Sequence, residues 1–169
     1  GKWVKFLEKE NNQVFEIWTR EYIDRFANYL LLRAQIFKGN KEHPTIVLEV
    51  GAGDGKFSYF LNERLKELKI ENIQVITTGY ENEHFNIKSP YNNVENISEK
   101  EALMKYKPGI IICSWMIPNE DWTADFRKAP SVKEYILIGP EGPCGTDETW
   151  QKNWQDDFGK TIDSFDEET

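Results

Sequence analysis

A short apolar segment that runs directly into a glycine-rich turn constrains this chain more than any other feature. Residues 45–50 read Thr-Ile-Val-Leu-Glu-Val, with no alternation of polar and apolar positions. This pattern is typical of a strand that is buried on both faces of a parallel sheet. Residues 51–55 read Gly-Ala-Gly-Asp-Gly, and apolar residues then recur at helical spacing from Phe57 to Leu68. A strand, a glycine turn and a helix in this order predict the start of a βαβ unit.

The rest of the chain continues this alternation. A long amphipathic helix is expected before the first strand, ended by Gly39, and the third helix is expected to begin at a capping box in which Ser98 pairs with Glu101. The predicted helices are Val14–Phe37, residues 57–68 and Glu99–Tyr106, and the predicted strands are Thr45–Val50, Ile73–Thr77, Val94–Ile97, Ile110–Ser114 and Glu134–Gly139. The sequence therefore predicts an α/β fold, a three-layer Rossmann-like sandwich with a mostly parallel sheet, over residues 1–140.

Charge separates this predicted domain from the end of the chain. The 169 residues carry a net charge of −8, and nine acidic residues but only two lysines lie between Glu141 and Thr169. Residues 141–169 are therefore expected to form an acidic C-terminal segment that contains Gly, Pro and Trp. The remainder is close to neutral and lacks the basic face that phosphate backbones require, which argues against binding to duplex nucleic acid.

The scarcity of cysteine and histidine excludes several classes of site. Two cysteines, Cys113 and Cys144, cannot build a disulfide framework, and two histidines are too few for a His-rich metal centre. No metal site is therefore expected. No apolar run reaches the roughly 18 residues of a membrane span, and the start of the chain lacks a signal-peptide pattern. A cytoplasmic, reducing location without membrane association is the expectation.

The glycine turn can be compared with two phosphate-binding patterns. The P-loop pattern fails twice, because Val50 occupies its first glycine position and Phe57 its hydroxyl position. The dinucleotide pattern G-x-G-x-x-G fails once, because Lys56 stands at its third glycine. A nicotinamide-cofactor enzyme thus remains as a weaker alternative.

What fits the turn is an acidic residue, one further residue and then G-x-G-x-G, as in residues 49–55. This pattern resembles motif I of the class I S-adenosylmethionine-dependent methyltransferases. The order of predicted elements over residues 14–140 is also similar to theirs. The resemblance implies that S-adenosylmethionine is the cofactor and that the chain transfers its methyl group. Such a displacement depends chiefly on orientation, so no catalytic residue is assigned.

The resemblance also implies roles for particular residues at the ends of the strands. Glu49 would attract the cationic methionine end, and the glycine turn would run flat against the ligand. After the second strand, Glu81 would accept the ribose hydroxyls, although Gly79 as the true tip would leave that role empty. The implied cofactor-binding residues are Glu49, Gly51, Ala52, Gly53, Gly55, Tyr80, Glu81, Asn96 and Ser114. A structural alternative for Glu49 is that it caps the following helix.

The methyl acceptor cannot be identified from a motif, because the end of the fourth strand lacks the Asn/Asp-Pro-Pro-aromatic pattern of amine methylating enzymes. A protein side chain or a small molecule is favoured. Trp115, Trp122 and Phe126 surround Asp121 in the sequence and form either a packed loop or a cage for a cationic group. The alternative function is a non-catalytic binding or regulatory module of the same fold.

The number of predicted strands is smaller than in the family that the motif resembles. That family's sheet normally has seven strands, whereas five are predicted here. Absence of the last pair would leave a sheet edge exposed, and proteins usually cover such edges by association. The chain is therefore expected either to pair with a second copy as a homodimer or to lack a C-terminal portion.

Overall fold

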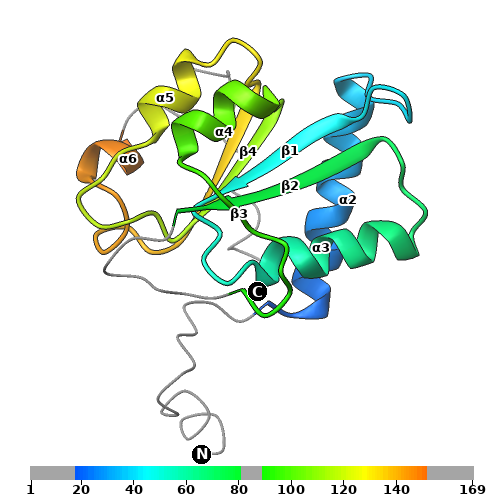
Figure 1. The fold of residues 1–169 in the computed structure, drawn as a ribbon, viewed down its shortest axis with the longest axis horizontal. Coiled ribbons are helices and arrows are strands. Elements are labelled where there is room, and N and C mark those ends of the chain that lie inside the picture. Colours follow the sequence, from blue (N-terminus) through cyan, green and yellow to red (C-terminus); the bar gives the residue numbers. More distant parts are fainter. Residues whose placement is uncertain (1–17, 81–88, 152–169) are drawn as a thin grey trace, which may run out of the picture.

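The computed structural model describes residues 18–80 and 89–151, which form one parallel sheet covered by helices (Figure 1). The strands lie in the order β3-β2-β1-β4-β5, and every neighbouring pair is parallel. The strands are β1 (Thr45–Val50), β2 (Ile73–Gly79), β3 (Glu95–Asn96), β4 (Ile110–Ser114) and β5 (Glu134–Ile138). The helices are α2 (Arg20–Ile36), α3 (Lys56–Glu67), α4 (Glu99–Tyr106), α5 (Thr123–Lys128) and α6 (Asp147–Gln151). The predicted α/β class is confirmed, with a sheet that is entirely parallel.

Three predicted elements agree with the structure in both of their bounds. The bounds of β1, β4 and α4 are those predicted, and Ser98 and Glu101 form the expected capping box. The predicted third strand is present as β3 but is shorter than Val94–Ile97, because only Glu95–Asn96 pairs with β2. Strand β2 continues two residues beyond its predicted end at Thr77, because Thr78 and Gly79 pair with β3.

Helices were placed less accurately than strands. Helix α2 begins at Arg20, because Thr19 has an extended backbone and its hydroxyl caps the helix by accepting from the Tyr22 amide at 3.1 Å. The predicted start of this helix, Val14, lies outside the described residues. The short helices α5 and α6 are not among the helices predicted above.

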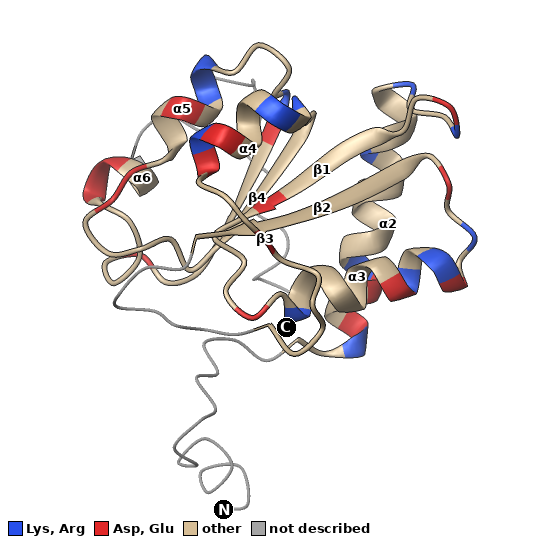
Figure 2. Cartoon of the chain, viewed as in Figure 1, with Lys and Arg blue, Asp and Glu red and all other residues tan. Residues whose placement is uncertain are grey.

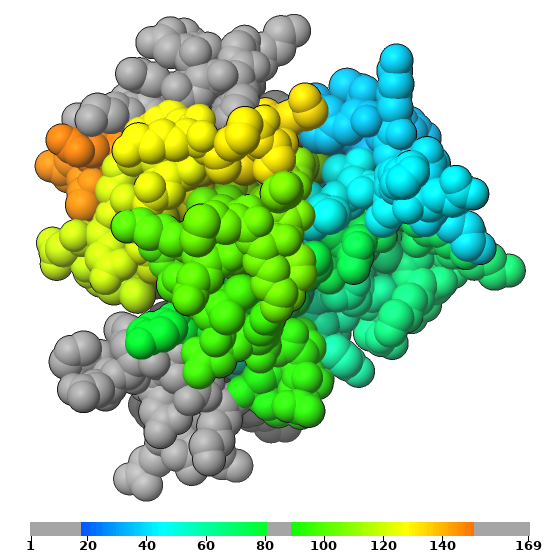
Figure 3. Space-filling model, turned by 45° about the horizontal axis from the view of Figure 1, so that its top comes forward, coloured from blue at the N-terminus to red at the C-terminus, as the bar shows by residue number. Residues whose placement is uncertain are grey.

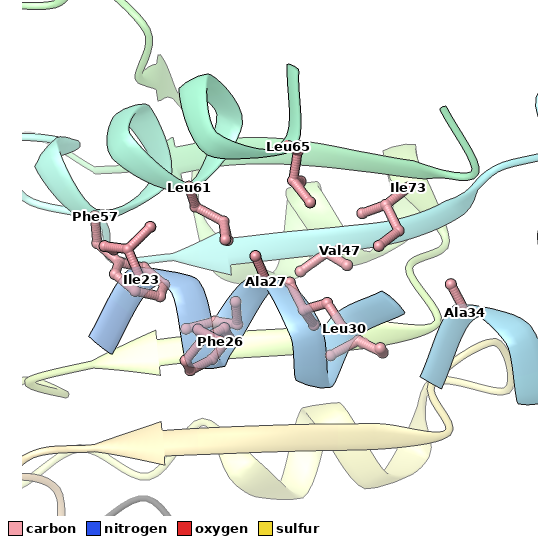
Figure 4. Close-up of a cluster of buried hydrophobic side chains, with 12 residues drawn as sticks. Ile23, Phe26, Ala27, Leu30, Ala34, Val47, Phe57, Leu61, Leu65 and Ile73 are labelled. Atoms are coloured by element: carbon pink, nitrogen blue, oxygen red, sulfur yellow. The ribbon is translucent and has the colours of Figure 1, made fainter. Parts of the chain in front are cut away.

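Two layers of apolar side chains enclose the sheet. On one face, α2 and α3 pack Phe26, Leu30 and Leu61 against Val47 of β1, and none of these side chains is exposed (Figure 4). On the other face, α4 and α5 cover Leu48, Val50 and Ile111 (Figure 1). The space-filling view shows α4 (green) directly beside α5 (yellow) over this second face (Figure 3). Alternate residues of β1 thus point to opposite layers, as expected for an internal strand.

A polar cluster fixes α2 to the last strand of the sheet. The Tyr29 hydroxyl donates to the carboxylate of Glu134, the first residue of β5, and Arg33 Nε donates to the same carboxylate at 2.6 Å. Burial and the neighbouring carboxylate raise the pKa of Tyr29. Across residues 18–80 and 89–151, β5 has a strand partner on its β4 side alone. We predicted that such an edge is covered by a second copy of the chain or by further strands, and this stays a prediction.

Two further kinds of feature are not found in residues 18–80 and 89–151. None of their helices is both long and apolar enough to cross a bilayer. In the described ranges, no three His, Cys, Asp or Glu side chains come together in a way that could hold a metal ion.

Candidate functional site

The candidate site lies where the direction of strand addition reverses. From β1 the chain adds β2 and β3 on one side of the sheet, and it then returns to place β4 and β5 on the other side. In open parallel sheets of this kind, ligands bind outside the carboxyl ends of the strands at this reversal point. The glycine turn, residues 51–55, follows β1 at this point (Figure 1).

The backbone of the turn explains why glycine occupies three alternating positions. Gly51, Gly53 and Gly55 have φ values of 61°, 57° and 73°, in the left-handed region that side chains disfavour. The Ala52 amide donates to the Thr78 carbonyl at 3.0 Å, which joins the turn to the end of β2. The Gly55 amide donates to the Ala52 carbonyl at 3.0 Å and closes the turn. The turn is therefore held in one shape by its neighbours.

Two of these glycines are also covered by the protein's own side chains. A Cβ atom on Gly51 would lie 2.9 Å from Cζ3 of Trp122, and one on Gly55 would lie 2.5 Å from Oδ1 of Asn93. Asn93 also donates from Nδ2 to the Gly55 carbonyl at 3.1 Å. Close packing, as well as backbone conformation, therefore requires glycine at both positions.

Glu49 lies beneath the turn rather than at the surface. Its exposed fraction is 1%, and its carboxylate accepts from the hydroxyl and the backbone N–H of Ser58 in the first turn of α3. The α3 N-cap, Gly55, supplies no side-chain cap. The structure thus shows the helix-capping arrangement for Glu49. Burial raises the pKa of Glu49 from its ordinary 4.5 to about 7, and the nearby negative charge of Asp54 also raises it. The hydrogen bonds from Ser58 lower this pKa, but they do not outweigh burial.

Asp54 caps the same helix from outside. Its Oδ1 accepts from the Lys56 amide at 3.1 Å, and its Oδ2 forms an ion pair with Lys56 Nζ at 3.0 Å. A carboxylate at a helix N-terminus is favourable because of the exposed N–H groups there. Two carboxylates, one buried and one near the surface, therefore hold the start of α3.

The remaining predicted residues lie along the same edge of the sheet. Tyr80 follows β2 and is 67% exposed, and Asn96 stands opposite Gly79 in the β2–β3 pair. Ser114 is the last residue of β4 and pairs with Ile138. The carboxyl edge therefore brings together the turn, Tyr80, Asn96 and Ser114. Glu81 lies outside the described residues.

Gly79 has a closer relation to the turn than the sequence indicated. A Cβ on Gly79 would lie 3.5 Å from the Ala52 amide nitrogen and 3.3 Å from Cγ1 of Val94. The tip of β2 therefore packs against the turn itself. Neighbouring Glu95 is engaged elsewhere, because its carboxylate accepts from Lys105 and from the Tyr106 hydroxyl, which lowers its pKa.

The loop after β4 contributes residues whose contacts the sequence did not reveal. Trp115 has a φ of 56°, a strained conformation for a bulky residue, of the kind that clusters at functional sites. Phe126 is fully buried, and Asp121 accepts hydrogen bonds from the Thr123 amide, the Thr123 hydroxyl and the Thr149 hydroxyl. The packed-loop alternative therefore describes Asp121 and Phe126. Trp122 differs, because it packs over Gly51.

Charges of both signs lie around this edge. Acidic residues lie in the turn before α3, on α5 and on α6, but α5 also carries Arg127 and Lys128 (Figure 2). Within the turn, the positive charge of Lys56 is matched by Asp54. The described charges beside the turn are therefore largely paired, and exposed acidic residues of this edge lie on α6.

The sequence matches no protein-family model, and no curated protein matches it significantly.

Proposed function

We propose that this chain binds S-adenosylmethionine at the carboxyl edge of β1 and β4 and transfers its methyl group to an acceptor. The observation that carries the proposal is the glycine turn, residues 51–55, with three left-handed glycines at the strand reversal point. Among the described residues, the strand order β3-β2-β1-β4-β5 is that of a Rossmann-like core with five of the seven strands of a methyltransferase sheet. The acid and three glycines of residues 49–55 resemble motif I of the class I methyltransferases.

The residues on this edge fit such a ligand in complementary ways. The main chain of the turn would hold the methionine end, and exposed Tyr80 would flank the adenine with Asn96 nearby. Ser114 and the strained Trp115 would face the acceptor. Glu49 acts through the turn that it supports, because its carboxylate is buried against Ser58.

The protein's contribution to the reaction is orientation. The bound cofactor supplies a methyl group on a positively charged sulfur, which is already activated for displacement. The side chains at the edge need to align the acceptor with that methyl group and to keep water away. This chemistry does not require a catalytic triad, and no catalytic residue is assigned.

A non-catalytic binding module is the second candidate, and the internal contacts of the motif favour it. Glu49 caps α3, and the spaces beside Gly51 and Gly55 are filled by Trp122 and Asn93. These contacts give the acid and the glycines a role in packing that is independent of methyl transfer.

Methyl transfer separates the two candidates. The chain is incubated with methyl-labelled S-adenosylmethionine and a cell lysate, and label is measured in the protein fraction and in the small-molecule fraction. We expect label in one of these fractions that exceeds the signal from heat-denatured protein and from the Gly51→Val variant. Binding of the cofactor without any labelled acceptor would support the module instead.

A further inference from the structure

Trp122 connects the two strands that flank the candidate site. It follows the loop after β4 and is the N-cap residue of α5, yet its ring lies over the turn after β1. Two of its ring carbons, Cζ3 and Cη2, lie 2.9 and 3.1 Å from the position of a Cβ on Gly51. The ring is only partly buried and packs at the margin of the second core layer. An aromatic surface therefore stands at the reversal point itself.

The surroundings of the ring increase its attraction for positive charge. Trp122 Nε1 donates to the Glu120 carboxylate at 2.7 Å, and a hydrogen bond to an anion shifts electron density into the indole ring. A second acid, Asp121, lies between Glu120 and Trp122 in the loop. The carboxylate of Glu120 thus makes the indole face a better partner for a cation.

A sulfonium is the feature that distinguishes S-adenosylmethionine from its demethylated product, whose sulfur is neutral. We propose that the indole of Trp122 contacts the sulfonium and makes the site selective for the charged donor over the neutral product. The inference rests on the proposed function, because it assigns a specificity-determining residue within the same site. Trp is the aromatic side chain that attracts cations most strongly.

The test compares the affinities of the two ligands for three proteins. Calorimetry gives the dissociation constants of S-adenosylmethionine and S-adenosylhomocysteine for the wild type, Trp122→Leu and Trp122→Phe. We expect Trp122→Leu to weaken binding of the charged donor by about 3- to 30-fold. Binding of the neutral product should change by less than about twofold, and Trp122→Phe should retain most of the preference because it keeps an aromatic face.

Trp150 provides the matched control. It is also partly buried and its Nε1 also donates a hydrogen bond, to the Cys144 carbonyl at 2.7 Å, but it lies on α6. Trp150→Leu should leave the ratio of the two affinities unchanged. Circular dichroism and thermal melting establish that each variant is folded before titration.

Three results would overturn the inference. Equal weakening of both ligands in Trp122→Leu would show that Trp122 only supports the turn. Tighter binding of both ligands would show that the indole obstructs the site. Failure of the wild type to bind either ligand would refute the proposed function itself, and this outcome is recognised before any variant is compared.

Discussion

Replacing Gly51 with valine is expected to lower the free energy of unfolding by about 3 kcal/mol and to abolish binding of S-adenosylmethionine. Gly51 has a φ of 61°, which a β-branched residue adopts at high cost. A Cβ there would also lie 2.9 Å from the Trp122 ring, so the ring or the turn must move. Urea unfolding measures the loss of stability, and calorimetry measures binding.

Gly142 provides a control that separates backbone strain from crowding. Its φ is 98°, and nothing lies within 4 Å of a Cβ built on it. Gly142→Val should therefore lower the free energy of unfolding by about 1–2 kcal/mol through backbone strain only, and it should leave ligand binding intact. If Gly51→Val is no more destabilising than Gly142→Val, the claim that the Trp122 ring packs closely on Gly51 is contradicted.

The second large effect is a dependence of stability on pH that originates at Glu49. In the folded chain its pKa is about 7, whereas the ordinary value is 4.5. The folded state therefore holds a proton between these values that the unfolded state releases, so stability falls as pH rises through this range. Glu49→Gln removes this titration. Between pH 5 and pH 8 the wild type should lose about 2–3 kcal/mol of unfolding free energy relative to Glu49→Gln.

Glu101 gives the opposite sign and serves as the control. Its carboxylate accepts from Ser98 at the start of α4, and these hydrogen bonds lower its pKa. The stability that it contributes is therefore present above its ordinary pKa and is lost as pH falls. Urea titrations across the pH range should show opposite trends for Glu49→Gln and Glu101→Gln against wild type. A wild-type chain that tracks Glu49→Gln at every pH would show that Glu49 is not buried as described.

The fold was predictable where a local pattern and burial act together. The uninterrupted apolar run of β4 and the capping box of α4 identified both elements with their bounds, because each pattern has a direct structural cause. The length of β3 was not predictable, because only two residues pair and pairing depends on where β2 ends. Helix α5 begins at a turn in which Asp121 accepts from the Thr123 amide, and a six-residue helix has too few turns to show a clear apolar period.

The candidate site was predictable in position but only partly in its contacts. The glycine spacing indicated the left-handed turn and its place after β1. Sequence left two roles open for Glu49, and only the fold shows its carboxylate under the turn against Ser58. The contact between Trp122 and Gly51 joins residues far apart in the chain, so no local pattern could reveal it. The only sequence feature that indicated a role for this loop was its group of aromatic residues after β4.

The central claim is that the carboxyl edge at β1 and β4 holds S-adenosylmethionine, and calorimetric titration of the wild-type chain tests it most directly. S-adenosylmethionine, S-adenosylhomocysteine and NAD are titrated separately under the same conditions. We expect saturable binding with micromolar-range affinity for the first two and no binding of NAD. Absence of binding by S-adenosylmethionine, or binding of NAD alone, would contradict the account.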